Sequence, residues 1–178
     1  MKRSILLIFL LAIVLNSCKK TDNTPAGSGT VTIDNKTFQS TTYYVYGFSF
    51  SKAKKVSTLE NPGPDVTVYV NSDTPSDTWL YLQANNLNPS FSKIGDYPDA
   101  ASASAAFDNL KTVGSYQWTD LAQPIAPNQV WVYKTGTPCY AKFRVISTVN
   151  ETRNSLPYGE ITFEWVYQPD GSTTFPSK

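Results

Sequence analysis

The C-terminal part of the chain alternates apolar and polar residues in three runs, at residues 129–135, 139–147 and 159–168. Each run is rich in β-branched and aromatic residues and is bounded by turn formers, such as those at 136–138 and 169–171. Runs of this kind are typical of β-strands joined in sequence. The pattern predicts an antiparallel meander, with a loop between the second and third strands.

The alternation also predicts which face of this meander is buried. Since successive strand residues point to opposite faces, the third run gathers four apolar residues on one face: Ile161, Phe163, Trp165 and Tyr167. The second run places Phe143 opposite Lys142 and Arg144. We therefore expect one buried face and one face that is largely exposed to water.

Earlier segments continue the β pattern, with one exception. Alternating or apolar runs at 30–33, 41–50, 66–70 and 79–83 predict further strands, and Gly47 marks a bulge or a close backbone contact. Near residue 100 the period changes, because Ala103, Ala106, Phe107 and Leu110 follow helical spacing. The chain is thus predicted to be all-β, an antiparallel sandwich or meander with one short α-helix at about 99–111.

The N-terminal segment has the features of an export signal. Two basic residues precede an uninterrupted apolar run at 5–15, which is too short as a helix, at about 16 Å, to cross a hydrocarbon core of about 30 Å. The sequence that ends at Cys18 resembles the lipobox of bacterial lipoproteins. We expect a signal peptide at 1–17, a lipidated Cys18 with a polar tether at 18–29, and a single all-β domain at 30–178.

Composition excludes several classes of function. The chain has no histidine, which removes Ser-His-Asp and Cys-His catalysis and histidine-based zinc sites. Its net charge of +1 provides no basic surface for nucleic acid. Cys139 is the only cysteine besides Cys18, so a lipid on Cys18 would leave Cys139 as a buried thiol without a disulfide partner. The sequence predicts no enzyme, no catalytic residues and no metal site.

Aromatic residues are the remaining candidates for binding. The chain has 4 Trp, 11 Tyr and 9 Phe. Tyr43 and Tyr44 are consecutive in a predicted strand, so one of them is expected on the surface or over a cleft. Because exposed aromatic rings stack on sugars or porphyrins, a ligand-binding face is predicted from five residues: Tyr43, Tyr44, Tyr46, Trp79 and Trp118.

The meander also carries a resemblance to a known family. Trp-Val-Tyr-Lys-Thr at 131–135, Ala-Lys-Phe-Arg-Val at 141–145 and the run at 159–171 resemble the C-terminal part of the HmuY family. These are outer-membrane lipoproteins of Gram-negative bacteria, several of which capture haem. The resemblance implies an all-β fold with minor helix and an outer-membrane location. It transfers no haem ligand, because the family's axial ligands are His or Met and Met1 is the only such residue here; tyrosinate is the remaining way to hold haem iron.

The expected function is therefore a non-enzymatic cell-envelope lipoprotein of HmuY-like type. It would be attached to the outer membrane through the lipid on Cys18, and would bind a small ligand, with haem as one candidate cofactor, or an outer-membrane partner protein. Two alternatives stay open. One is a glycan-binding surface lipoprotein that uses exposed Trp and Tyr, and the other is a structural or partner-docking component without a small ligand.

Overall fold

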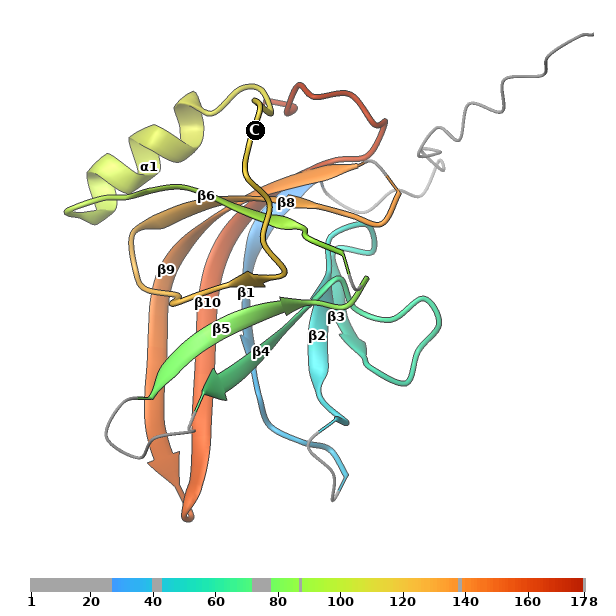
Figure 1. Ribbon diagram of the computed structural model, residues 1–178, viewed down its shortest axis with the longest axis vertical. Helices are drawn as coiled ribbons and strands as arrows, with labels where there is room; N and C mark the ends of the chain where they lie inside the picture. Colours follow the sequence, from blue (N-terminus) through green and yellow to red (C-terminus); the bar gives the residue numbers. More distant parts are fainter. Residues whose placement is uncertain (1–26, 40–42, 72–77, 87, 138, 178) are drawn as a thin grey trace, which may run out of the picture.

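Two antiparallel five-stranded sheets pack face to face in the computed structural model, which describes residues 27–39, 43–71, 78–86, 88–137 and 139–177 (Figure 1). The first sheet contains, in spatial order, β1 (Ser28–Asp34), β10 (Leu156–Gln168), β9 (Tyr140–Arg153), β8 (Gln129–Lys134) and β6 (Phe91–Asp96). The second contains β3 (Lys54–Ser57), β2 (Tyr46–Ser49), β4 (Val66–Asn71), β5 (Trp79–Ala84) and β7 (Leu121–Ala122). One helix, α1 (Ala100–Asn109), completes the fold. The all-β sandwich with one short helix is confirmed.

The predicted meander corresponds to β8, β9 and β10, but its last two strands are longer than expected. The predicted loop between them is wrong, because β9 continues to Arg153 and β10 begins at Leu156. Only Asn154 and Ser155 lie between, with φ of 49° and 63°. A two-residue turn with positive φ at both positions matches the twist of a hairpin and lets the strands pair up to the turn.

The side chains between the two sheets form one apolar core. Phe163 and Trp165 of β10 meet Phe48 of β2, with ring centroids 5.8 Å and 5.1 Å apart. We call this cluster the inner core; its members include Phe48, Phe50, Val68, Leu82, Phe91, Trp131, Tyr133, Phe143, Ile161, Phe163, Trp165 and Tyr167. The buried face predicted for β10 is confirmed.

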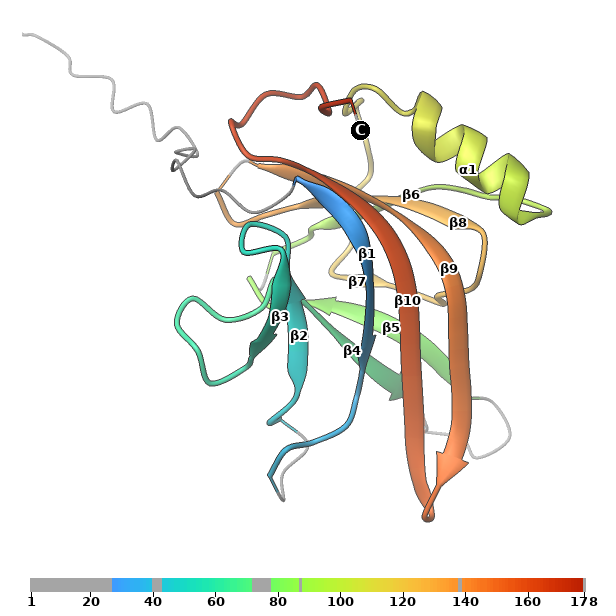
Figure 2. The same ribbon diagram turned by 180° about the vertical axis from the view of Figure 1, so that it is seen from behind.

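The opposite face of the first sheet is covered by α1 (Figures 1 and 2). The helix begins as predicted after Asp99, whose Oδ1 accepts a hydrogen bond from the Ser102 amide at 2.7 Å, an N-cap that satisfies a free donor of the first turn. Phe107 is fully buried against the sheet. We call this second cluster the outer core: Phe107, Val130, Val132, Val166 and Phe175.

This cover makes the prediction of a largely wet outer face wrong for half of the sheet. Lys142 is only 3% exposed. Its Nζ donates to the carbonyl oxygens of Phe107 and Leu110 at 2.6 and 2.9 Å, where the last turn of α1 leaves acceptors without intrahelical partners. Further along the same face, Arg144 and Glu164 form an ion pair at 2.9 Å and are mostly buried. Glu164, which the alternation places on the face expected to be exposed to water, is therefore also mostly buried.

The N-terminal half matches the prediction less closely. The strand predicted at 41–50 is reduced to β2, and residues 40–42 lie outside the described part of the chain. Strands β3, β6 and β7 were not predicted. Gly47 does mark a close backbone contact, since a Cβ there would lie 2.2 Å from the Val66 carbonyl oxygen. The predicted signal peptide at 1–17 and the first part of the tether at 18–29, including Cys18, also lie outside the described residues.

Candidate functional site

β2 and β4 of the second sheet separate toward the end of the molecule that carries the tip of the β9–β10 hairpin, opposite α1 (Figure 1). In the described chain, β2 and β4 pair at a single position, Phe48 with Val66, and β4 then continues alone on that side to Asn71. The space beyond this point is a hollow of about 570 Å³. We call it the end hollow; its lining is Asn35, Lys36, Thr37, Tyr69, Val70, Arg153, Asn154, Leu156, Pro157 and Tyr158.

The floor of the end hollow is held by close contacts between β10, β4 and the residue that follows β1. A Cβ on Gly159 would lie 2.7 Å from Val70 Cγ2 and 2.4 Å from Leu80 Cδ2, so glycine permits this approach of the sheets. Asn35 donates through its amide N–H to Gly159 O at 3.1 Å, and its Oδ1 accepts from Gly159 N at 2.9 Å. The chain after β1 is thereby fixed against β10.

Two cationic side chains lie on an aromatic ring at this hollow. The guanidinium carbon of Arg153 is 3.4 Å from the ring centroid of Tyr158, and Lys36 Nζ is 5.4 Å from the same centroid. Leu156, next to them, is 68% exposed. Arg153 is also ion-paired with Glu151. The hollow thus combines apolar surface with two positive charges, an arrangement suited to a ligand that has an apolar body and an acidic group.

Tyr158 is not a source of tyrosinate. Its hydroxyl donates to Glu160 Oε2 at 2.7 Å. Burial, this hydrogen bond and the nearby carboxylates together raise the pKa of Tyr158 to about 12. The neutral phenol therefore predominates at neutral pH. The other tyrosine of the end hollow, Tyr69, stacks on Tyr81 with ring centroids 5.6 Å apart.

Three of the five predicted binding residues gather around the chain between β1 and β2, outside the end hollow. Tyr43 is 76% exposed, whereas Tyr44 is half-buried and stacks on Phe38 at 5.8 Å. The expectation that one of this consecutive pair is exposed is met. Tyr46 is 47% exposed and also contacts Phe38, with centroids 4.9 Å apart.

The other two predicted residues lie in two further places. Trp79 begins β5 and is half-buried. Trp118 lines a separate hollow of about 640 Å³, which we call the edge hollow: Phe91, Lys93, Gln117, Trp118, Thr119, Asp120, Leu121, Gln123 and Trp131. The five residues therefore do not form one site.

Sequence reasoning missed the residues that line the end hollow. Arg153, Leu156 and Tyr158 fell in the loop predicted between β9 and β10, so no face was assigned to them. The available signal was the alternation of Thr148, Asn150 and Thr152 with apolar or charged neighbours up to Asn154-Ser155. Asn at a tight turn tolerates positive φ, which would have favoured a hairpin over a loop.

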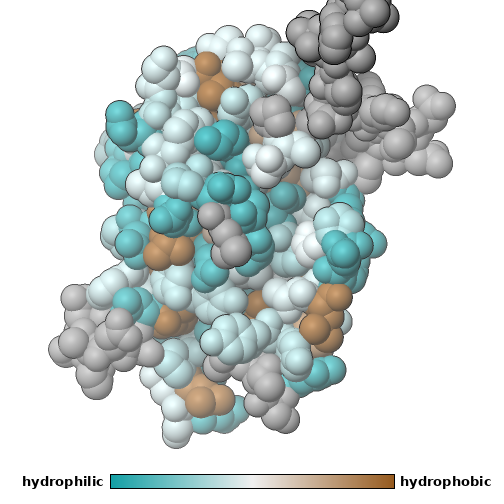
Figure 3. All heavy atoms as spheres, turned by 45° about the vertical axis from the view of Figure 1, so that its right-hand side comes forward, coloured by the Kyte–Doolittle hydropathy of each residue, from teal (hydrophilic) through white to brown (hydrophobic). Residues whose placement is uncertain are grey.

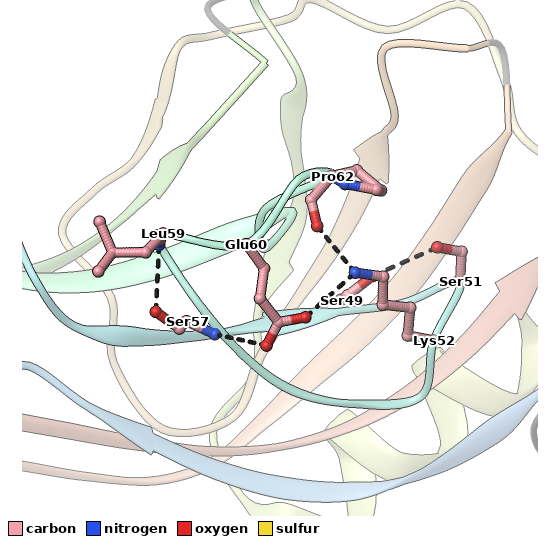
Figure 4. Close-up of polar contacts among 7 residues, drawn as sticks. All are labelled: Ser49, Ser51, Lys52, Ser57, Leu59, Glu60 and Pro62. Atoms are coloured by element: carbon pink, nitrogen blue, oxygen red, sulfur yellow. Dashed lines mark hydrogen bonds and ion pairs between the residues drawn. The ribbon is translucent and has the colours of Figure 1, made fainter.

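A third hollow, of about 390 Å³, lies beside the turn at 58–65. Its charged neighbours are already paired (Figure 4). Lys52 Nζ donates to Pro62 O at 2.8 Å and lies 3.5 Å from Glu60 Oε2, while Glu60 Oε1 accepts from Ser57 N at 3.4 Å. These contacts close the loop after β3, and we assign them a structural role.

The described residues contain no group of three or more His, Cys, Asp or Glu side chains placed to hold a metal ion. No helix among them is long and apolar enough to cross a membrane. On the face in Figure 3, apolar residues appear as small separate patches among polar ones. The hollows are therefore the features that a ligand hypothesis can use.

Cys139 differs from expectation in one respect. It is fully buried, as the alternation predicts, but the structure has it as disulfide-bonded rather than as a thiol. The chain contains one other cysteine, Cys18, which lies outside the described residues. Because one sulfur cannot carry both a lipid and a disulfide, an intramolecular disulfide and lipidation of Cys18 exclude each other.

Comparison with known proteins gives no matching family model, no similar curated protein and no similar solved structure. The class that the fold and the site define is an all-β sandwich with a ligand-sized hollow at its open end. Membership of the HmuY-like family stays a prediction from sequence resemblance.

Proposed function

We propose that this chain is a non-enzymatic, lipid-anchored protein of the bacterial cell envelope, of HmuY-like type, that binds a small amphipathic ligand in the end hollow. The single observation that carries the proposal is this hollow of about 570 Å³, with walls that are partly apolar and the cations Lys36 and Arg153 on the Tyr158 ring. Small-molecule sites commonly have a volume of about 300 to 1,000 Å³ and mix apolar walls with a few charged groups.

The position of the end hollow fits a protein that is anchored at its N-terminus. β1 begins with Ser28, within the last two residues of the predicted tether, and runs toward the hairpin-tip end (Figure 2). Its seven residues cover about 23 Å at the usual rise of a strand, and Lys36 follows at the hollow. The hollow is therefore at the far end of β1 from Ser28, where a ligand from the surroundings can reach it.

Haem is one candidate ligand, and the residues present limit how it would be held. Tyr158 does not fit as an iron ligand, because its hydroxyl is bonded to Glu160 and its pKa is raised to about 12. Carboxylates on a flat apolar ring would instead meet Lys36 and Arg153. Haem binding of this kind would rely on charge and apolar contact, and Tyr69 is the tyrosine to test for a direct bond to iron.

Ligand titration of a soluble protein that begins at Cys18 tests the proposal. This form keeps every described strand, the helix and both cysteines. We expect saturable binding of haem or of the amphipathic anion anilinonaphthalene sulfonate, weakened roughly tenfold in Lys36→Ala and Arg153→Ala, because each loses one charge contact of about 1.4 kcal/mol. Lys54→Ala, an exposed lysine on β3, is the matched control.

Binding of either probe that is unchanged in both variants would remove the end hollow as the site. For haem, a Soret band that shifts on binding and is lost in Tyr69→Phe would establish tyrosine ligation. A featureless, non-saturating haem response would exclude haem and leave the anionic probe as the measure of the hollow.

The lipid anchor has its own test, because the structure has Cys139 disulfide-bonded and the chain's other cysteine is Cys18, so the anchor requires that Cys139 is not bonded to Cys18 in the cell. Mass spectrometry of the N-terminal peptide from cell envelopes should show a diacylglyceryl group on Cys18, and Cys18→Ser should release the protein from the membrane fraction. A non-reduced peptide that links Cys18 to Cys139 would contradict the anchor.

A further inference from the structure

The edge hollow is built by a segment that joins the two sheets. Thr119 N donates to Phe91 O at 2.8 Å, and Phe91 N donates back to Thr119 O at 3.0 Å, which ties residues 118–120 to the free edge of β6. Immediately after, Ala122 of β7 pairs with Leu82 of β5 in the second sheet. Because it is bonded to both sheets, the segment has a fixed position, and so do the side chains that it presents.

Trp118 is held firmly while part of its indole ring stays accessible. Lys134 Nζ lies 4.8 Å from its ring centroid, and the ring of Tyr116 packs edge-on at 5.9 Å. The side chain is nevertheless only half-buried and lines the hollow. Trp131 behaves differently, since it is 3% exposed and its Nε1 donates to Gln129 Oε1 at 3.1 Å. The ring of Tyr140 also lies 6.4 Å from the Trp118 centroid, so the accessible part of the Trp118 ring is the aromatic surface on which a ligand can stack.

Three polar side chains line the same hollow as this ring. Gln117, Asp120 and Gln123 are exposed, and no hydrogen bond within the described chain engages their side chains. Two amides and a carboxylate offer both donors and acceptors. The positive charge in the lining, Lys93, is paired with Asp96 at 2.9 Å. The edge hollow therefore differs from the end hollow, because it presents hydrogen-bonding groups without a free cation in its lining.

We propose that the edge hollow binds a neutral sugar residue of a glycan chain. A pyranose ring has one face of C–H groups that packs on an indole, and its adjacent hydroxyls each donate and accept, which matches amide and carboxylate side chains. The volume of about 640 Å³ is within the usual range for small-ligand sites and leaves room for more than one sugar unit. This site is separate from the end hollow and does not depend on the function proposed for it.

Native gel electrophoresis in gels that contain neutral polysaccharides tests this site, with dextran, mannan, galactan and xylan as the probes. The soluble protein that begins at Cys18 should be retarded by at least one of them. Trp118→Ala should weaken that retardation at least about tenfold, since stacking of this kind contributes on the order of 1 kcal/mol and the hydrogen bonds depend on it. Asp120→Asn and Gln123→Ala, both exposed, should weaken it without a change in melting temperature.

Trp79→Ala is the matched control, because Trp79 is also half-buried but lies on β5, outside the edge hollow. No retardation in any of the four gels would overturn the proposal. Retardation that is unchanged in both Trp118→Ala and Asp120→Asn, or equally reduced in Trp79→Ala, would overturn it as well. Lys36→Ala should leave glycan retardation unchanged, so failure at one hollow is distinguishable from failure at the other.

Discussion

The two faces of the first sheet are built from the same strands but are buried in different ways. The inner face packs on a second sheet, and its core consists of large aromatic and branched side chains in mutual contact. The outer face packs on one short helix and the C-terminal segment, and it includes the buried cation Lys142 at the end of that helix. A sheet that covers another sheet excludes water along whole strands. A helix covers only part of a face, and the backbone N–H and C=O groups at its ends need hydrogen-bond partners from elsewhere.

The largest difference should appear when one phenylalanine is removed from each core. Phe163 lies among Phe143, Phe48 and Phe50, with centroids at 5.4, 5.8 and 6.3 Å, so Phe163→Ala should lower the free energy of unfolding by about 3 to 5 kcal/mol. Phe107→Ala should cost less, near the lower end of that range, because α1 can shift toward the sheet and fill part of the cavity. Urea denaturation of both variants measures this. Equal losses would show that the helix is as rigidly packed as the second sheet.

The next largest effect on stability is expected from Lys142, the buried cation of the outer face. Lys142→Met keeps the length of the side chain but removes the donors to the carbonyl oxygens of Phe107 and Leu110. We expect a loss of about 1 to 3 kcal/mol, the usual cost of leaving buried acceptors without partners. Denaturation by urea gives the value, and Lys111→Met, an exposed lysine just beyond α1, is the control. A stability equal to that of the unmodified protein would mean that water reaches the end of the helix.

Lys142 also shows where sequence reasoning stops. The alternation of residues 141–145 correctly separated Ala141, Phe143 and Val145 from Lys142 and Arg144, and helical spacing located α1 to within two residues at each end. Hydrophobic periodicity and secondary-structure propensity are local properties, so they identify strands, helices and their faces. They do not show which part of a sheet face is covered by a helix that is distant in sequence. Lys142 was therefore expected to be exposed to water.

The candidate site was less predictable for the same reason. The end hollow brings together residues from the chain after β1, from β4 and from the β9–β10 tip, more than 100 positions apart. Tyr43 and Trp118 were selected as single aromatic residues that the sequence places on the surface. That prediction depends on local alternation, and it is correct for Tyr43. The meeting of Lys36 with Arg153 on Tyr158 depends on how the chain after β1 lies against the β9–β10 tip, which no local pattern encodes.

A smaller effect is expected where the outer face emerges from under the helix. Arg144 and Glu164 are 14% and 20% exposed, and Nη2 of Arg144 donates to Glu164 Oε2 at 2.9 Å. Glu164→Gln should lower the free energy of unfolding by about 1 kcal/mol, near the upper limit for ion pairs at a surface. Glu151→Gln breaks the more exposed pair with Arg153 and should change it by less than about 0.5 kcal/mol. Chemical denaturation at low and high salt compares the two pairs; a loss at Glu151 as large as that at Glu164 would contradict the role of burial.

The smallest expected effect has the opposite sign and concerns the charged group beside the inner core. Asp65 accepts a hydrogen bond from the Phe50 amide at 2.7 Å, but burial outweighs this contact and raises the pKa of its carboxyl above the ordinary 3.8. A raised pKa in the folded state means that the stability contributed by the protonated group is complete below pH 3.8 and is lost as pH rises through the folded value.

Asp65→Asn should therefore be slightly more stable than the unmodified protein at pH 7, and the advantage should vanish toward pH 3.5. Melting temperatures of both proteins across this range test the sign. If the unmodified protein gains stability relative to the variant as pH rises, the hydrogen bonds of the carboxylate outweigh its burial.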